Sequence, residues 1–357
     1  MAMAMFGQPK KVVATRVVAA DGSGDYVDIQ EAIDSLPAGG GVVYVKEGTY
    51  TITTVITINK SNVALIGAGK ATSIFLAEDS DCDCINLGDN ATTRTGILIA
   101  DLSIDGNRDN NAGTLYGIEL LGKVDDSKIS GCWITECDTT GIKFTGNNNR
   151  NIITENTVTS CDNIGIDIQD STDPNIVSDN TCSSMGTHGI QAIATTGSIY
   201  IIGNVCTGNT EHGIACSTND AVISNNMCLS NTKDGVYLTS SVRNTINGNC
   251  CKLNGEHGIE IRSSSQNVIT ANTYTKNSQT TTNTYDGIRL SLTCEYNTIT
   301  ANTIYRGGFG NIHKYGINEE AAAANYNIIL GNCIYLSGST ANTRVQGANT
   351  ILQHNNP

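Results

Sequence analysis

The segment Ile152-Ile-Thr-Glu-Asn-Thr-Val-Thr-Ser-Cys-Asp-Asn-Ile-Gly165-Ile-Asp-Ile-Gln returns 24 residues later as Ile176-Val-Ser-Asp-Asn-Thr-Cys-Ser-Ser-Met-Gly-Thr-His-Gly189-Ile-Gln-Ala-Ile. In both copies an Ile/Val-rich segment ends at an asparagine, and a Gly-Ile pair follows that asparagine. The apolar segments are too short for helices and alternate as strands do. A unit of about two dozen residues that recurs in this way predicts a solenoid of stacked coils.

Two columns of residues define the repeat. Glycine followed by Ile or Val recurs at Gly117, Gly141, Gly165, Gly189, Gly213, Gly235, Gly258, Gly287 and Gly316. A second column follows each glycine by 13 to 16 residues, at Cys132, Asn156, Asn180, Asn204, Asn226, Asn249, Asn272, Asn302 and Asn332. The glycines and asparagines suit turns and left-handed backbone. If coils stack as parallel strands about 4.8 Å apart, such asparagines can hydrogen-bond to the coils on either side, which predicts an asparagine ladder.

A third column lies two positions beyond the asparagines. It reads Val158, Cys182, Cys206, Cys228, Cys251, Tyr274, Ile304 and Ile334, and strand alternation places it in the core. The chain has 13 cysteines, an odd number, without paired CxxC spacing. We therefore expect mostly free thiols, although disulfides between adjacent coils remain open, since their geometry cannot be read from sequence.

The N-terminal region has a different pattern. Asp28-Ile-Gln-Glu-Ala-Ile-Asp-Ser-Leu-Pro37 predicts a short helix that ends at a proline, followed by a β run over Gly41–Tyr50. Such a helix can cap the open end of a solenoid. We predict an all-β, single-stranded right-handed parallel β-helix with an N-terminal arm over 1–18, a capping helix and first coils over 19–90, and repeats over 91–357 that continue the same domain.

Charge and composition exclude several functions. The net charge is −13 and no Lys/Arg run occurs, which argues against nucleic acid or an anionic membrane as partner. No stretch reaches the roughly 20 apolar residues of a membrane span, and the first residues lack the apolar region of a signal peptide. The same negative charge disfavours an acidic polysaccharide unless a cation intervenes, whereas a neutral glycan is not repelled.

The segments Ala20–Ile33, Gly41–Tyr50 and Val63–Gly69 resemble the entry region of pectin lyase-like β-helix proteins, including pectinesterases and phage tailspike domains. The later coils resemble the repeats of mannuronan epimerases and of periplasmic copper-maturation proteins. This resemblance implies the β-helix fold over nearly the whole chain. It implies function less directly, because the superfamily contains lyases, hydrolases, esterases, epimerases and non-catalytic adhesins.

The catalytic motifs of these relatives are not intact. Tyr116–Leu120 does not match a pectinesterase strand, and no second esterase strand is present. The segments nearest to a polygalacturonase pattern are Asp125-Asp126, Glu211-His-Gly213 and Glu256-His-Gly258. The epimerase motif Asp-Pro-His-Glu is absent, because Asp173-Pro174 continues as Asn-Ile176. Candidate site residues therefore have to come from the register of the coils.

The column before each glycine places His188, His212, Asp234 and His257 on consecutive coils, and Glu211 and Glu256 precede two of them. Two residues after each glycine, the same edge carries Glu119, Lys143, Asp167, Gln191, Ala215, Tyr237, Glu260 and Arg289. These side chains can supply acid and base to a bound saccharide, or His and Asp can bind a metal. The alternative is that the column is a set of polar, solvent-exposed turn residues duplicated with the repeat.

Within these columns we predict catalytic roles for His188, His212, Asp234, His257, Asp167, Glu211 and Glu256. The pairs to consider for glycoside hydrolysis are Asp167 with His188 or Glu211, and Glu260 with Asp234 or Glu256. For a lyase or epimerase, Arg262, Arg289 or Lys143 can neutralise a uronate, and Tyr237 can contact substrate. Separately, Asp81-Cys-Asp-Cys84 with Glu78 and Asp79 can hold Ca²⁺, although a solvated acidic turn is the favoured explanation.

Two functions remain open on this basis. The first is a carbohydrate-binding β-helix that cleaves or epimerises a polysaccharide. The second is a non-catalytic rod, such as a surface adhesin or a virion or tail-associated spike component. Both predict an extracellular or virion-associated location, a glycan partner, and the capacity for lateral homo-oligomers.

Overall fold

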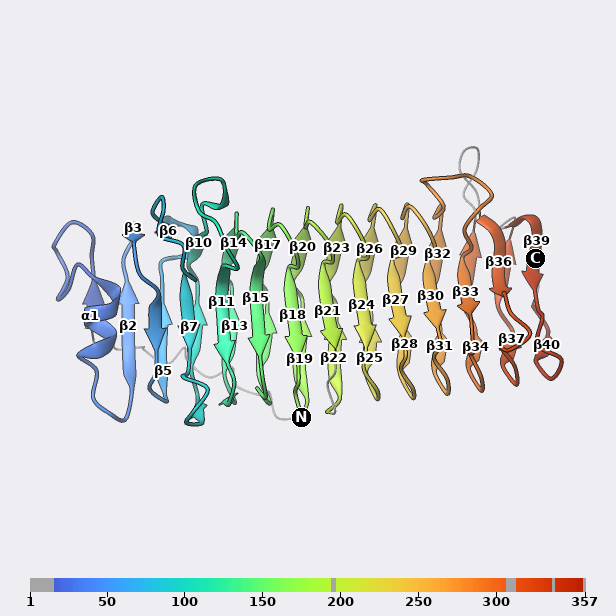
Figure 1. Cartoon of the computed structure of the whole chain (residues 1–357), viewed down its shortest axis with the longest axis horizontal. Helices are drawn as coiled ribbons and strands as arrows, with labels where there is room; N and C mark the ends of the chain where they lie inside the picture. Colours follow the sequence, from blue (N-terminus) through green and yellow to red (C-terminus); the bar gives the residue numbers. More distant parts are fainter. Residues whose placement is uncertain (1–15, 194–196, 306–312, 336–337, 356–357) are drawn as a thin grey trace, which may run out of the picture.

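The chain forms an elongated parallel β-helix (Figure 1), which confirms the predicted fold class. The computed structural model describes residues 16–193, 197–305, 313–335 and 338–355. Three long parallel sheets, here called A, B and C, run the length of the solenoid, and successive coils contribute one strand to each. None of the helices in these ranges is long and apolar enough to cross a bilayer.

Sheet A has fourteen strands. In order, they are β1 (Arg16–Val18), β2 (Gly41–Val45), β5 (Val63–Ile66), β9 (Leu98–Ala100), β13 (Lys128–Ser130), β16 (Ile152–Thr154), β19 (Asn175–Ser178), β22 (Ile199–Ile202), β25 (Val222–Ser224), β28 (Thr245–Asn247), β31 (Val268–Thr270), β34 (Thr298–Thr300), β37 (Ile328–Leu330) and β40 (Ile351–Gln353).

Sheet B has twelve strands. They are β3 (Gly48–Ile52), β6 (Thr72–Leu76), β10 (Ser103–Asp105), β14 (Trp133–Thr135), β17 (Thr157–Thr159), β20 (Thr181–Ser183), β23 (Val205–Thr207), β26 (Met227–Leu229), β29 (Cys250–Lys252), β32 (Thr273–Thr275), β35 (Thr303–Tyr305) and β38 (Cys333–Tyr335).

Sheet C also has twelve strands and carries the candidate site. They are β4 (Ile56–Ile58), β7 (Ile85–Leu87), β11 (Tyr116–Leu121), β15 (Thr140–Thr145), β18 (Ile166–Gln169), β21 (Ile190–Ile193), β24 (Ile214–Ser217), β27 (Val236–Thr239), β30 (Ile259–Arg262), β33 (Ile288–Ser291), β36 (His313–Glu319) and β39 (Gly338–Arg344). A small sheet joins β8 (Arg94–Thr95) to β12 (Val124–Asp125), and two short 3-10 helices, η1 (Gly69–Ala71) and η2 (Arg108–Asn110), lie in turns.

The helix α1 (Ile29–Asp34) covers the first coil, at the blue end of Figure 1. Asp28 caps its N-terminus by accepting a hydrogen bond from the Glu31 N–H, and Lys60 donates to carbonyls at its C-terminus. Ile29 and Ile33 are buried in the core. The predicted capping helix is therefore present. Arg16–Val18, expected within the N-terminal arm, instead form β1 of sheet A, and residues 1–15 lie outside the described ranges.

The core is a narrow stack of aliphatic and thiol side chains. The predicted inward column, from Val158 to Ile334, is at most 1% exposed, and Cys182, Cys206, Cys228 and Cys251 follow one another in register. All the cysteines in the described ranges are free. On sheet C, burial raises the pKa of the Cys216 thiol to about 12, as expected for a packing group rather than a reactive thiolate.

Hydrogen-bonded asparagines join the coils along the predicted column. Asn226 is representative: its Oδ1 accepts from the Asn204 N–H and Nδ2, and its Nδ2 donates to Ile201 O and Asn249 Oδ1 at 2.8–3.0 Å. Two further columns of the same kind, which the repeat had not singled out, run through Asn209, Asn231, Asn254 and Asn277, and through Asn244, Asn267, Asn297 and Asn327.

The glycines of the repeat are required for a different reason from the left-handed backbone that we expected. Gly165 and Gly213 have ordinary φ, but a Cβ on Gly213 would lie 2.7 Å from Gly235 O and 2.9 Å from Cys228 Cβ. These glycines are required because neighbouring coils approach too closely for a side chain. The left-handed positions lie instead just before the asparagine column, for example at Asp179 (φ +57°) and Ala271 (φ +54°).

Candidate active site on sheet C

The outer face of sheet C carries one continuous polar row. The strand register aligns the residues two positions after each glycine, as the sequence predicted: Glu119, Lys143, Asp167, Gln191, Ala215, Tyr237, Glu260, Arg289 and Asn318. Successive members are one strand spacing apart, about 4.8 Å. The row therefore forms a track along the solenoid axis.

A depression of about 340 Å³ opens in this row over β21, β24 and β27. Ala215 is the small residue in a run of long side chains, so its position leaves a hollow between Gln191 and Tyr237. The polar lining comes from His188, Gln191, Glu211, His212, Ser217 and Tyr237. This volume is in the range of small-molecule sites. It brings together four predicted site residues, His188, Glu211, His212 and Tyr237.

The column before each glycine is buried or half-buried, and not the exposed turn that we considered as an alternative. His212 is 7% exposed, and Asp234 and His257 are at most 1% exposed. The three histidines of this column each accept, through Nδ1, a hydrogen bond from the backbone N–H of the residue at the same position in the next coil. These donors are His212 for His188, Asp234 for His212, and Asp286 for His257. Asp234 accepts from the His257 N–H through Oδ1 at 2.8 Å. The column therefore also has a structural role.

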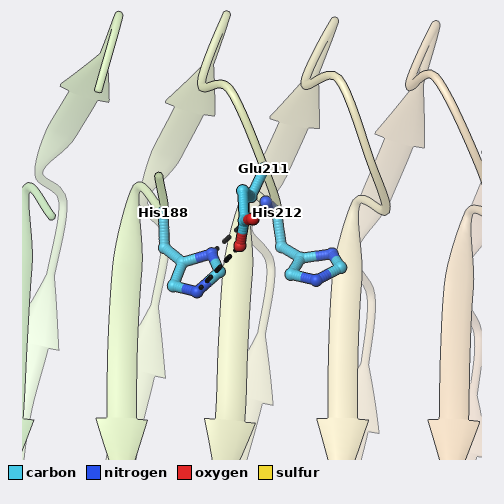
Figure 2. Close-up of side chains that lie close together, drawn as sticks. All are labelled: His188, Glu211 and His212. Atoms are coloured by element: carbon cyan, nitrogen blue, oxygen red, sulfur yellow. Dashed lines mark hydrogen bonds and ion pairs between the residues drawn. The ribbon is translucent and has the colours of Figure 1, made fainter. Parts of the chain in front are cut away.

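Three rings stack across consecutive coils at the depression. The His188 and His212 ring centroids are 5.2 Å apart, and His212 lies 4.5 Å from the Tyr237 ring and nearly parallel to it. Figure 2 shows Glu211 between the two histidines, with its carboxylate toward His188. His188 Nε2 lies 3.5 Å from Glu211 Oε2. Stacking fixes the planes of the two histidine rings, and with them the direction in which each Nε2 points.

The His212 ring contacts the buried Asp234 side chain. Asp234 Oδ2 lies 3.2 Å from His212 Nδ1 and makes no hydrogen bond as placed among the described residues. Because Nδ1 already accepts the Asp234 N–H, the contact is favourable when the proton lies on Oδ2. Burial, and secondly the Glu260 carboxylate, raise the pKa of Asp234 well above its usual value, which fits a protonated carboxyl. His212 then carries its own proton on Nε2.

The neighbouring Glu211 has the opposite electrostatics. Lys233 Nζ donates to Glu211 Oε1 at 2.6 Å. Burial opposes ionisation of Glu211, but Lys233 and the two histidines outweigh it and lower its pKa below the usual value. Burial lowers the pKa of His188 and of His212 to about 4, so both rings are neutral near pH 7. Glu211 at the depression and the buried Asp234 behind His212 thus have pKa values shifted in opposite directions.

The C-terminal end of the track is an ion-pair cluster. Arg289 pairs with Glu320 at 2.5 Å and lies 3.9 Å from Glu260 and 3.0 Å from His257 Nε2. Glu260 accepts from Ser291 Oγ at 2.7 Å. Burial and the nearby Asp234 raise the pKa of Glu256. The predicted pair of Asp234 and Glu260 is thus brought together, with one oxygen of each within 4.8 Å of the other.

The N-terminal end of the track has a separate pair. Lys143 Nζ and Asp167 Oδ2 lie 2.5 Å apart, and Gln169 also donates to Asp167. Burial raises the pKa of Asp167 despite Lys143. Asp167 thus contacts Lys143 and Gln169, rather than the His188 or Glu211 with which we expected it to pair. Arg262 is exposed beside Thr239 at the rim of the depression.

In the acidic turn considered for Ca²⁺, carboxylate oxygens accept hydrogen bonds from the backbone of the next coil. Asp81 Oδ1 accepts from the Ala112 N–H and Asp83 Oδ1 accepts from the Tyr116 N–H. These bonds hold the turn against the next coil. The structure also adds Lys233, which the sequence reasoning missed, and assigns Gln191 and Ala215 to the site. Gln191 and Ala215 were in the predicted row, but only packing reveals that Ala215 creates the hollow.

Comparison with known families agrees with this architecture. Residues 165–284 and 217–357 match the family model described as "Periplasmic copper-binding protein (NosD)", and the two matches together cover more than half of the chain. The chain belongs to this family. Residues 15–140 match the pectinesterase model. Both ends of the chain therefore fall within the pectin lyase-like β-helix superfamily, which confirms the resemblance seen in the sequence.

Individual relatives cover the chain in part or share its fold. The Arabidopsis thaliana protein named probable pectinesterase 56 is 33% identical over 103 residues, which are 27% of this chain and 36% of the relative. The A-module of the Azotobacter vinelandii mannuronan C-5 epimerase AlgE6 superposes with a TM-score of 0.82 at 20% identity, over 92% of this chain and 93% of that one. The Dettilon tailspike protein superposes with a TM-score of 0.66 at 15% identity, over 84% and 62%. The chain spans about a third or less of the length of the curated relatives it matches.

Proposed function

We propose that this protein is a polysaccharide-modifying enzyme and that its reactive groups are Glu211 and the His212–Asp234 pair. A pectinesterase-like N-terminal region, and a fold shared with an epimerase module and a tailspike, support a polysaccharide as substrate. The polar track on sheet C supports binding of a polymer along the solenoid axis. The depression then holds the reacting sugar.

The observation that carries this proposal is the contrast between the surroundings of two carboxyls: Glu211 accepts from Lys233 Nζ at 2.6 Å, whereas Asp234 is buried with its Oδ2 against the His212 ring. Lys233 keeps Glu211 ionised, whereas burial keeps Asp234 protonated behind His212. Adjacent groups whose pKa values are shifted apart are the usual signature of an acid and a base. Glu211 is the base, and the His212–Asp234 pair is the acid.

The geometry defines the proton movements. The Nε2–H of His212, on the side of the ring away from Asp234, donates its proton to the leaving oxygen or to the sugar. The proton on Asp234 Oδ2 then crosses the 3.2 Å to Nδ1, which at the same time releases the hydrogen bond that it accepts from the Asp234 N–H. The ring stays neutral and the negative charge ends on Asp234. Glu211 meanwhile accepts a proton from water, in hydrolysis, or from a sugar carbon, in elimination or epimerisation.

The charges near the depression favour a neutral sugar at the reacting position. Lys233 is paired with Glu211, and further along the track Lys143 and Arg289 are paired with Asp167 and Glu320. A uronate there would rely on Arg262 at the rim. The substrate panel should therefore include neutral glycans beside pectate and alginate.

The family's description refers to copper, and among the described residues two groups bring one ligand atom each within 4.8 Å of one another: His188, Glu211 and His212, and Asp234, His257 and Glu260. A metal-binding histidine normally donates its other ring N–H to an acceptor. Here Nδ1 of each histidine faces a backbone N–H donor, and Arg289 lies beside His257 Nε2. These groups do not fit a metal ion, so the proposed chemistry involves no metal.

The decisive variant is Asp234→Asn. An asparagine can accept from the His257 N–H and donate to His212 Nδ1, so it reproduces the contacts of a protonated aspartate without a transferable proton. We expect an unchanged melting temperature and a loss of product formation of about 10²- to 10⁴-fold. Products are measured as reducing ends and as unsaturated sugars by absorbance, on neutral glycans, pectate and alginate, with and without Ca²⁺.

His354→Gln is the matched control, because His354 is exposed at the C-terminal end and far along the chain from the site. It should leave product formation unchanged. If wild-type protein leaves every glycan in the panel intact, the enzyme proposal fails. If Asp234→Asn is as active as wild type, the acid assignment is wrong.

A non-catalytic rod remains the second candidate. The hydrogen bonds that the histidine column makes to neighbouring coils give these residues a structural role without any chemistry. The likeness of the fold to a tailspike also suits a rod, and either function fits an extracellular or virion-associated location. Intact glycans in the panel, with retained binding or none, would favour this reading.

A further inference from the structure

The outer face of sheet A, a different sheet from the one that carries the candidate site, has an apolar stripe. Strand register places one outward residue from each of eleven consecutive coils in a single line: Leu98, Lys128, Ile152, Ile176, Tyr200, Val222, Thr245, Val268, Thr298, Ile328 and Ile351. Eight of these are apolar, two are threonine and one is charged. Ile328 and Ile351 at the C-terminal end are 37% and 49% exposed.

Strand propensity does not explain this line. In the parallel outward row on the same strands, two residues further on, only three of eleven positions are apolar (Ala100, Ile202 and Leu330), and six carry a hydroxyl: Ser130, Thr154, Ser178, Ser224, Thr270 and Thr300. Threonine has the β-branched shape of valine and satisfies an outward strand position equally well. Isoleucine and valine in the neighbouring row therefore add apolar surface that the fold itself does not need.

We infer that this stripe, from Leu98 to Ile351, is the contact surface for a second copy of the same chain. A straight ladder of side chains repeating at the strand spacing can be covered along its whole length only by a surface with the same pitch and straightness. The stripe of another copy has that pitch, so side chains of the two ladders can interdigitate as they do between stacked sheets.

The area and the charge suit a reversible association. Eleven coils at about 4.8 Å give a length near 50 Å, and a width of about 10 Å gives on the order of 500 Å² per copy. The total, on the order of 1,000 Å², is at the lower end for specific interfaces. Each chain has a net charge of −13, but within the stripe only Lys128 is charged. Two copies can therefore meet here without placing carboxylates against each other.

This arrangement leaves the polar track free, because the track is on sheet C and the stripe is on sheet A. It is independent of the proposed function, since a rod and an enzyme can both associate laterally. It also predicts an unusual dependence on salt. The contact is apolar and the copies repel through their net charge, so added NaCl should strengthen the association.

The test is sedimentation of the full chain over a range of concentrations, at low and high NaCl. We expect a concentration-dependent dimer or higher lateral oligomer that salt strengthens. Ile176→Lys and Val268→Lys should each shift the protein to monomer by at least about tenfold in dissociation constant. Thr181→Lys, at an outward position of sheet B, is the matched control and should leave the association unchanged.

Melting temperature and circular dichroism separate lost association from lost folding, because both stripe positions are on the surface. A monomer at every concentration tested would overturn the inference. An oligomer that persists in both stripe variants, or one that Thr181→Lys disrupts equally, would place the interface elsewhere and also overturn it.

Discussion

Replacing Asn226 by alanine tests whether the asparagine columns hold the coils together. The substitution removes four hydrogen bonds of 2.8–3.0 Å. The Asn204 N–H loses its acceptor and becomes an unpaired buried donor. Asn204 Nδ2 keeps its bond to Val177 O, and Asn249 Oδ1 keeps its bond from the Asn226 N–H. The substitution therefore leaves the Asn204 N–H without an acceptor, and it removes one hydrogen bond each from Asn204 Nδ2, Ile201 O and Asn249 Oδ1.

An unpaired buried donor costs about 1–3 kcal/mol, and each other lost bond about 0.5–1.5 kcal/mol. The free energy of unfolding should accordingly fall by about 5 kcal/mol. Chemical denaturation measures this fall, and amide exchange locates it, since a solenoid transmits such a change mainly to neighbouring coils. Exchange should accelerate in β22 to β29 and much less in β2 or β37.

Two comparisons make this prediction refutable. Met227→Ala, at the adjacent exposed position, should change stability by less than about 0.5 kcal/mol. Asn226→Asp keeps an acceptor but removes the Nδ2 donor and introduces a buried charge, so it should destabilise at least as much as alanine. A loss below about 1 kcal/mol for Asn226→Ala would show that the column contributes little beyond the core.

Two further predictions concern the site. Burial holds the pKa of His188 and His212 near 4, below the usual 6.5, so between pH 6.5 and 4 the unfolded chain binds protons that the folded chain does not. The contribution of each neutral histidine to the free energy of unfolding, on the order of 3 kcal/mol, should be present above pH 6.5 and lost as the pH falls to 4. The denaturation midpoint of His212→Asn should therefore depend less on pH than that of the wild type, and an unchanged pH dependence would contradict the prediction. Ala215→Phe should fill the depression and reduce glycan binding or turnover at least about tenfold, with an unchanged melting temperature, whereas full binding would show that the sugar lies elsewhere on the track.

The fold could be predicted because each coil repeats the same physical requirements. Short apolar segments, a glycine where coils approach closely, and an asparagine that bonds to its neighbours recur at nearly fixed spacing. A constant spacing also fixes the register of the strands, so the row from Glu119 to Arg289 could be aligned from the sequence alone. Where the glycine interval lengthens to 29 residues between Gly258 and Gly287, the extra residues lie in a turn and β30 and β33 stay in register.

The sequence by itself therefore determined the β-helix, its core columns and the line of candidate side chains. Only the tertiary structure decided which of those side chains share a site and in which protonation state. The identity of His212 and Asp234 does not reveal that one ring nitrogen faces a buried carboxyl, or that Ala215 opens a hollow beside them. Burial and pairing depend on how adjacent coils pack at their turns, and a repeat pattern specifies the position of a side chain but not its surroundings.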